Sequence, residues 1–401
     1  MSGLSLKKKK DAETETAAKE SPKGKGKKGP FDGLAKKQRT RSFAAQARGK
    51  LCFAFDFGEY AVKIAVGKIG KDRIDVKHLI LLENDERKTK LTAASLVEWR
   101  KKINRAFSQR NLSPTGNLGL VTIGCRNYIS RQMNIPYAGE EDRQGLVAYE
   151  MSSALSLDME AYLFQHKVLD TYEESGVKMC AVWAAAVPKE LCELYYSLLE
   201  SLRLKPAVMD IDVNGVERLM AADSQLKRAA DVGTVAVIDL GIRGTEVSIY
   251  EKGLYKTGAN VEQGDGRLVT AAKNALGVQI ADIHNGNKLV VPPKTVYEIL
   301  LQADRSENAR MFRETVEEWL SAVNMVIRQY DLNHQDAPVS RLMLYGGSPQ
   351  VSWLKAYLEK YLEIPAEDIQ SADCFHMIGR AGKTEHAATQ YLNALDLLLI
   401  K

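Results

Sequence analysis

The stretch Thr234-Val-Ala-Val-Ile-Asp-Leu-Gly-Ile-Arg-Gly-Thr-Glu-Val-Ser-Ile-Tyr250 reads as an apolar strand, a D-x-G turn and a second strand with alternating apolar residues. Asp239 and Gly241 form the turn, and Gly244 and Thr245 lead into the second strand. A carboxylate at such a tip can hold a hydrated divalent cation, and glycine lets backbone N–H groups approach a phosphate. The pattern predicts a hairpin that faces a ligand.

The same pattern occurs about half a chain earlier, in Leu51-Cys-Phe-Ala-Phe-Asp-Phe-Gly-Glu-Tyr-Ala-Val-Lys-Ile-Ala-Val66. Asp56 and Gly58 form its turn. One D-x-G turn alone is also ordinary hairpin chemistry. Two of them in equivalent contexts indicate a duplicated fold that supplies one phosphate loop from each half.

A third element is Arg341-Leu-Met-Leu-Tyr-Gly-Gly-Ser-Pro-Gln350, a buried strand that ends in Gly346, Gly347 and Ser348 before an amphipathic run. In open α/β sheets, ligands bind beyond the carboxyl ends of strands, where a double glycine lets a flat base lie against the backbone. Alone, this element would indicate only a tight strand-to-helix turn.

Together and in this order, the three elements resemble the actin-like ATPase superfamily. The segments 127–136, 140–156, 162–169, 182–188 and 207–212 narrow the resemblance to the PilM family of type IV pilus assembly proteins, relatives of FtsA. The resemblance covers about residues 51–380. It implies an α/β actin-like two-domain fold, made of duplicated ribonuclease-H-like mixed sheets flanked by helices, with a small inserted subdomain in domain I.

The resemblance also implies the domain organisation. We expect domain I over residues 51–214, including an inserted subdomain at about 125–190, and domain II over residues 215–378. Residues 379–401 are expected to form a C-terminal helix that returns to domain I. Residues 1–50 remain outside as a disordered basic tail.

If the resemblance holds, ATP with Mg²⁺ is the expected ligand. Asp56 and Asp239 would hold the cation through water, and Asp212 would orient an attacking water as the catalytic residue, although a helix N-cap is an equally good interpretation of Asp212. The expected nucleotide-binding residues are Asp56, Gly58, Lys63, Asp239, Gly241, Thr245, Gly346, Gly347 and Ser348.

Two departures from the family pattern argue against fast turnover. Glu59 and Tyr60 stand where small or hydroxyl residues are usual, and a carboxylate there would repel a polyphosphate. Asn285 and Gly286 interrupt a segment that is a continuous helix near the ribose in relatives. We therefore expect nucleotide binding with at most slow ATP hydrolysis.

The composition fits a soluble protein of the reducing cytoplasm. The 401 residues are 45% hydrophobic and 27% charged, and the five cysteines include no C-x-x-C pair. Apolar runs are far shorter than the roughly 20 residues that span a bilayer. The histidines show no metal-binding spacing.

The charge is concentrated in the tail. Residues 1–50 hold 15 Lys and Arg against 5 Asp and Glu, whereas residues 51–401 hold 41 against 46. Such a tail can act as a solubilising linker or bind an anionic membrane surface. Nucleic acid is the least favoured partner because no nucleic-acid-binding motif accompanies the lysines.

The resemblance implies a cytoplasmic ATP-binding scaffold at the inner face of the bacterial cell membrane. It would serve type IV pilus assembly or the related type II secretion by capturing the N-terminal cytoplasmic peptide of a bitopic, PilN-like membrane protein in a groove of the inserted subdomain. One alternative is an FtsA-like division or cytoskeletal protein that self-associates into filaments. The other is a small-molecule kinase, for which the sequence locates neither a catalytic base nor a substrate pocket.

Overall fold

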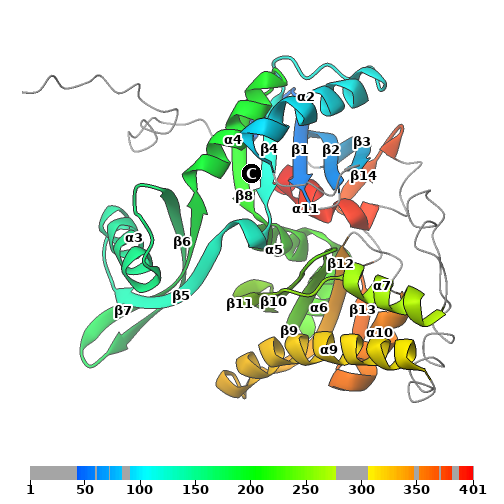
Figure 1. Ribbon diagram of the computed structural model, residues 1–401. Coiled ribbons are helices and arrows are strands. Elements are labelled where there is room, and N and C mark those ends of the chain that lie inside the picture. The colour runs from blue at the N-terminus through cyan, green and yellow to red at the C-terminus, as the bar shows by residue number, and fades with distance from the viewer. Residues whose placement is uncertain are drawn as a thin grey trace, which may run out of the picture. The chain divides into compact units, whose positions relative to one another are not determined.

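The computed structural model describes residues 43–58, 61–71, 73–83, 91–276, 306–346, 352–369, 372–381 and 388–400 (Figure 1). The predicted features in residues 1–42, Glu59, Tyr60, residues 281–288, Gly347 and Ser348 lie outside the described residues. Within the expected tail, residues Phe43–Ala47 form helix α1, and Ala47 is fully buried. Residues 43–50, which the sequence analysis assigned to the tail, therefore belong to the described structure.

The first sheet has the strand order β14-β3-β2-β1-β4-β8. Strands β1, β2 and β3 form an antiparallel meander, β4 runs parallel to β1, and β8 runs parallel to β4. Its strands are β1 (Cys52–Phe57), β2 (Ala61–Ile69), β3 (Ile74–Glu83), β4 (Leu118–Ile123), β8 (Lys205–Ile211) and β14 (Phe375–Met377).

The second sheet repeats this plan in the order β11-β10-β9-β12-β13. Again three antiparallel strands form a meander, and two further strands join it in parallel. Its strands are β9 (Thr234–Leu240), β10 (Thr245–Glu251), β11 (Leu254–Val261), β12 (Val339–Gly346) and β13 (Ala366–Asp368). The shared order confirms the duplicated fold that the two D-x-G hairpins predicted.

Helices pack on the first sheet because β1 alternates large and small apolar residues. The ring of Phe53 lies 5.1 Å from Phe107 of α2 (Ala93–Ser108), and the ring of Phe57 lies 5.1 Å from Tyr195 of α4 (Lys189–Ser201). The opposite face carries the small residues Cys52 and Ala54. There the C-terminal segment packs on β1, β2 and β4 as α11 (Leu392–Leu395) and a 3-10 turn (Asp396–Leu399).

The core of the second sheet is closed by α7 (Asp265–Leu276), α9 (Glu307–Asn333) and α10 (Ser352–Leu362). Helix α9 begins at Ser306, whose hydroxyl accepts a hydrogen bond from the backbone of Ala309. The apolar stripe of α9 is buried in this core: Phe312, Val316, Trp319, Leu320, Val323 and Ile327.

The inserted subdomain lies between β4 and α4 in the chain and follows the short turn Cys125–Asn127. Its three-stranded antiparallel sheet has the order β5-β7-β6, with α3 packed against it around Val147, Met151 and Phe164. The elements are β5 (Ile129–Pro136), α3 (Glu140–Leu155), β6 (Tyr162–Glu174) and β7 (Val177–Pro188).

Two helices, α5 (Asp212–Ala222) and α6 (Ser224–Val232), lead from β8 to β9. Asp223 caps α6 by accepting hydrogen bonds from the backbones of Gln225 and Leu226. None of the helices in the described part of the chain combines the length and the apolar character needed to cross a membrane.

Candidate functional site

The first D-x-G turn places an acid beside a lysine. Asp56 is the last but one residue of β1 and is 7% exposed, and Lys63 lies opposite it on β2, with Nζ 3.6 Å from Oδ2. Burial raises the pKa of Asp56, and the charge of Lys63 partly offsets this. A Cβ atom at Gly58 would lie 3.1 Å from the Ala61 carbonyl, which leaves little room for a side chain in this turn.

The second turn has the same backbone design. Gly241 donates its N–H to the carbonyl of Gly244 at 3.0 Å, and a Cβ atom at Gly241 would lie 2.8 Å from that oxygen. The backbone N–H of Gly266 bonds to the carbonyl of Ile242 at 3.0 Å and so fixes the loop from its other side. A side chain is therefore excluded at Gly241 and crowded at Gly58.

Asp239 is held by two residues from distant parts of the chain. Asn393 of α11 donates from Nδ2 to Oδ2 of Asp239 at 2.9 Å, and Tyr345 of β12 donates its hydroxyl to Oδ1 of Asn393 at 2.9 Å. Burial raises the pKa of Asp239, and Lys63 and Asn393 oppose this shift. A Cβ atom at Gly346 would approach Oδ1 of Asp239 to 2.7 Å, so any larger residue at position 346 would crowd this oxygen.

Asp212 is the first residue of α5 and is 2% exposed. Its Oδ2 accepts from the backbone N–H of Cys125 at 2.6 Å, and its Oδ1 accepts from the Tyr128 hydroxyl at 2.7 Å and from the Val213 N–H at 3.0 Å. Burial raises the pKa of Asp212 to about 6. The structure thus places Asp212 directly after β8, with both carboxylate oxygens hydrogen-bonded to protein groups.

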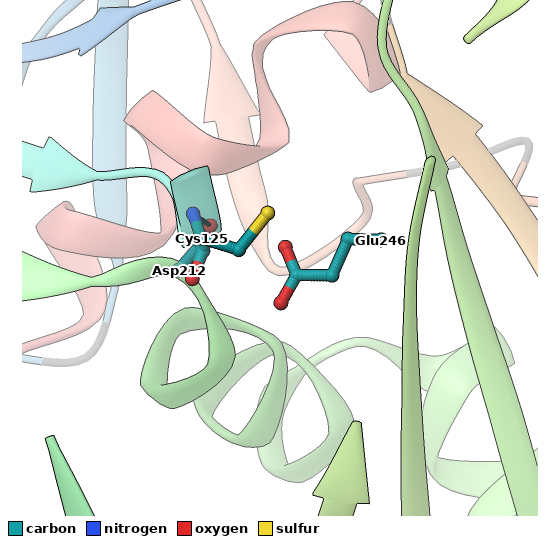
Figure 2. A group of neighbouring side chains, drawn as sticks. All are labelled: Cys125, Asp212 and Glu246. Carbon is teal, nitrogen blue, oxygen red and sulfur yellow. Dashed lines mark hydrogen bonds between the residues drawn. The ribbon is translucent and has the colours of Figure 1, made fainter. Parts of the chain in front are cut away.

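Glu246 of β10 points at the same place (Figure 2). Its carboxyl group interacts with that of Asp212. Burial and the negative charge of Asp212 raise the pKa of Glu246 well above its ordinary value. Two buried carboxyl groups in contact keep one proton between them, because both cannot be ionised there. At neutral pH, Glu246 is the partner that carries this proton and donates it to Asp212.

Cys125 completes the group in Figure 2, and ligand atoms of Cys125, Asp212 and Glu246 lie within 4.8 Å of one another. Burial and the neighbouring carboxylates raise the pKa of the Cys125 thiol far above its ordinary value. The group that binds metals is the thiolate, and this thiol stays protonated at neutral pH. The three side chains therefore form a buried cluster of a protonated thiol and two carboxyl groups that share one proton.

Thr245 lies in the core. Its hydroxyl donates to the carbonyl of Gln263 at 2.8 Å and accepts from the indole N–H of Trp319 at 2.9 Å, and the residue is fully buried. This arrangement does not fit the predicted phosphate contact of Thr245, because the donor of the hydroxyl is already used inside the protein.

The structure brings Asp56, Lys63 and Asp239 together, since the charges of Asp56 and Lys63 both act on Asp239. Asp212, Asp239 and Tyr345 also line a shared small hollow with Glu246. The sequence analysis missed Glu246, Asn393, Tyr345 and Tyr128. Glu246 directly follows Thr245 in the second hairpin and could have been noticed there, whereas Asn393 lies 154 positions from its partner.

The residues at this edge fit a magnesium-bound polyphosphate. Carboxylate oxygens suit Mg²⁺, and Asp56 and Asp239 supply them next to a lysine that can contact phosphate. Gly58, Gly241 and Gly346 leave the backbone accessible where a Cβ atom would crowd it. Glu246 adds an acid on the same side. Its proton keeps it neutral, so that it does not repel a bound anion.

The fold is similar to that of a solved chain described as "PilM-PilN type IV pilus biogenesis complex", with a TM-score of 0.66, 15% identity, and coverage of 87% of this chain and 97% of that chain. The ethanolamine utilization protein EutJ from Carboxydothermus hydrogenoformans matches at a TM-score of 0.45 and 12% identity, over 88% of this chain and 89% of that chain. No protein-family model and no curated protein sequence matches. The first likeness confirms the expected PilM-like, actin-like fold.

Proposed function

We propose that this protein is an actin-like, nucleotide-binding scaffold of type IV pilus assembly or a related secretion system. It docks on the N-terminal cytoplasmic peptide of a PilN-like inner-membrane protein and works in the cytoplasm at the membrane. The observation that carries this proposal is the inserted β5-β7-β6 subdomain with α3, set in a fold that covers nearly the whole solved chain from a PilM-PilN complex.

The loops at Asp56 and Asp239 support the nucleotide part of the proposal. When bound, Mg²⁺ neutralises phosphate charge. Asp56 and Asp239 would hold the hydrated cation, and the ammonium group of Lys63 would contact the phosphates. The proposed base-side contacts are those of Gly346 and of the neighbouring Gly347 and Ser348, which lie outside the described residues.

The surroundings of Asp212 support slow hydrolysis or none. A carboxylate offers about four lone-pair positions. Those of Asp212 receive the Tyr128 hydroxyl, the N–H groups of Cys125 and Val213, and the proton of Glu246. No position is left to orient an attacking water unless the pair with Glu246 separates.

The exposed edge strand of the inserted subdomain supports the peptide part. In the described sheet β5 pairs only with β7, so its outer edge can accept an extended peptide. Ile129 at the start of β5 is 37% exposed, and Tyr137 just after its end is 50% exposed. These two side chains lie at the two ends of β5, with Nζ of Lys178 of β7 3.9 Å from the centre of the Tyr137 ring, and are our proposed contacts for the peptide.

Fluorescence anisotropy with a labelled N-terminal peptide of the PilN-like protein from the same genome tests the docking. We expect saturable binding to the full chain and loss of binding in the double variant Ile129→Ser, Tyr137→Ser. The matched control replaces the exposed Met311 and Met325 of α9 with serine and should bind like the parent. Equal binding by both variants would refute this docking edge, and cooperative pelleting of the protein with nucleotide would favour a filament protein instead.

Calorimetric titration of ATP with Mg²⁺ tests the proposed nucleotide binding at the two D-x-G turns. Asp239→Ala should lose binding, whereas Asp231→Ala on the exposed side of α6 should not. If the folded parent binds no nucleotide, the scaffold acts without one.

A further inference from the structure

The C-terminal segment is fixed against the first sheet. Leu395, Leu397 and Leu398 are fully buried, and the segment contacts β1, β2 and β4. The fit is close: a Cβ atom at Gly67 of β2 would lie 2.9 Å from Cδ1 of Leu398. Packing against the first sheet therefore sets the position of the C-terminal segment.

A buried acid sets the position of the same segment along α5. Asp396 is fully buried, with Oδ1 3.4 Å from Nη2 of Arg218, and its carbonyl accepts from Nε of Arg218 at 3.3 Å. Gly215 of α5 has no Cβ atom, and one placed there would overlap Oδ2 of Asp396. Between these anchors the segment cannot slide by a residue without losing a buried ion pair.

Three residues before Asp396, Asn393 reaches the second half of the molecule. Its amide bonds to Oδ2 of Asp239, and the Tyr345 hydroxyl bonds to its carbonyl oxygen, each at 2.9 Å. The two bonds fix which end of the amide faces the carboxylate, because one partner is an acceptor and the other donates. Oδ2 is thereby occupied, and Oδ1 lies beside Gly346, where a Cβ atom would approach it to 2.7 Å.

We propose that Asn393 is a positioning residue of the nucleotide site, through which the C-terminal segment turns Oδ1 of Asp239 toward the hydrated cation. This inference rests on the proposed nucleotide binding. The proposal adds a residue of the C-terminal segment to a site built from the two D-x-G loops. The Tyr345 hydroxyl orients the amide of Asn393 by its hydrogen bond.

The test compares ATP binding with Mg²⁺ and ATP binding with a chelator, both by calorimetry on the full chain. Asn393→Leu keeps the size of the side chain and removes its hydrogen bonds. We expect it to weaken Mg²⁺–ATP binding about tenfold, as for the loss of one bond to a charged group, with metal-free ATP binding unchanged. Tyr345→Phe should give a smaller loss with the same metal dependence, and it serves as the test if Asn393→Leu does not fold.

The control is Asn308→Leu, an exposed asparagine of α9, which should bind like the parent. Equal Mg²⁺–ATP affinity of parent and Asn393→Leu would overturn the positioning role alone. An equal loss with and without metal would also overturn it, since that result indicates general damage to the cleft. Absence of ATP binding in the folded parent would instead refute the proposed function on which it rests.

Discussion

Glu246 lies directly opposite Asp239 in the β9–β10 ladder, at the place where Lys63 lies opposite Asp56 in the β1–β2 ladder. The two hairpins thus share a backbone plan but differ in charge. Acids at directly opposite positions repel each other. Glu246 avoids this by keeping a proton and bonding to Asp212. The side of the site at the second D-x-G turn therefore becomes the less favourable one for an anion when Glu246 loses its proton.

Glu246→Gln should tighten Mg²⁺–ATP binding only at alkaline pH. At neutral pH Glu246 keeps its proton and is as neutral as glutamine, which has the same size and can still donate to Asp212. Where the pH is high enough to ionise Glu246, its charge opposes the phosphates, so we expect the variant to bind about threefold to tenfold more tightly there, by calorimetry. Glu251→Gln, at the far end of β10 and paired with Lys256, is the control and should bind like the parent at both pH values. Unchanged affinity of Glu246→Gln at both pH values would show that the acid does not oppose nucleotide.

Thr245→Val separates the packing role of this residue from the predicted phosphate contact. Valine removes the partner of the buried Trp319 indole N–H, so we expect a loss of about 1–3 kcal/mol in the free energy of unfolding. Mg²⁺–ATP affinity should stay within about twofold of the parent. Urea denaturation monitored by tryptophan fluorescence and calorimetry give the two values. A tenfold loss of Mg²⁺–ATP affinity at unchanged stability would instead support the predicted phosphate contact of Thr245.

Local pattern was enough to predict the hairpins, because the D-x-G turns and the alternating residues around Val247 are short-range signals. The inserted subdomain and its place in domain I came from resemblance. The hydrogen-bond partners of the site residues could not be predicted from the sequence in this way. Whether Thr245 faces a phosphate or Trp319 depends on where α9 packs, and the contact of Asn393 with Asp239 joins residues 154 positions apart.

Stability should depend on pH through Glu246. Its pKa in the folded protein lies well above the ordinary value of 4.5, so the folded state holds this proton more tightly than the unfolded state does. The contribution to stability is complete below about pH 4 and declines as the pH rises toward neutrality. Relative to the parent, Glu246→Gln should therefore gain on the order of 1–3 kcal/mol between pH 4 and 7. Urea unfolding at several pH values measures this, and a constant difference would contradict the assignment.

Residues 1–42, which carry most of the positive charge of the tail, lie outside the described residues. If they bind anionic membranes, their removal should abolish sedimentation with phosphatidylserine vesicles, and the parent should release as salt is raised. Neutral phosphatidylcholine vesicles are the control. Equal sedimentation of the shortened and full chains would leave the tail as a linker.

Glu217 of α5 joins the inserted subdomain to the second sheet. Its carboxylate forms an ion pair with Lys167 of β6 and accepts the backbone N–H of Tyr255 at 2.7 Å, beside the contact between the rings of Trp183 and Tyr255 at 5.0 Å. Because the ring of Tyr128, which bonds to Asp212, also lies 6.5 Å from that of Trp183, the same contacts connect the subdomain to the acid pair.

Glu217→Ala should therefore loosen the inserted subdomain while the second sheet stays folded. Losing a charge-assisted bond of about 1.5–3 kcal/mol should speed amide exchange in β6 and β7 by about tenfold or more. Hydrogen exchange followed by mass spectrometry over residues 129–188 measures this, with Glu173→Ala on the exposed part of β6 as the control. If both variants exchange like the parent, the subdomain is held by its aromatic contacts alone, and Trp183→Ala becomes the variant that should release it.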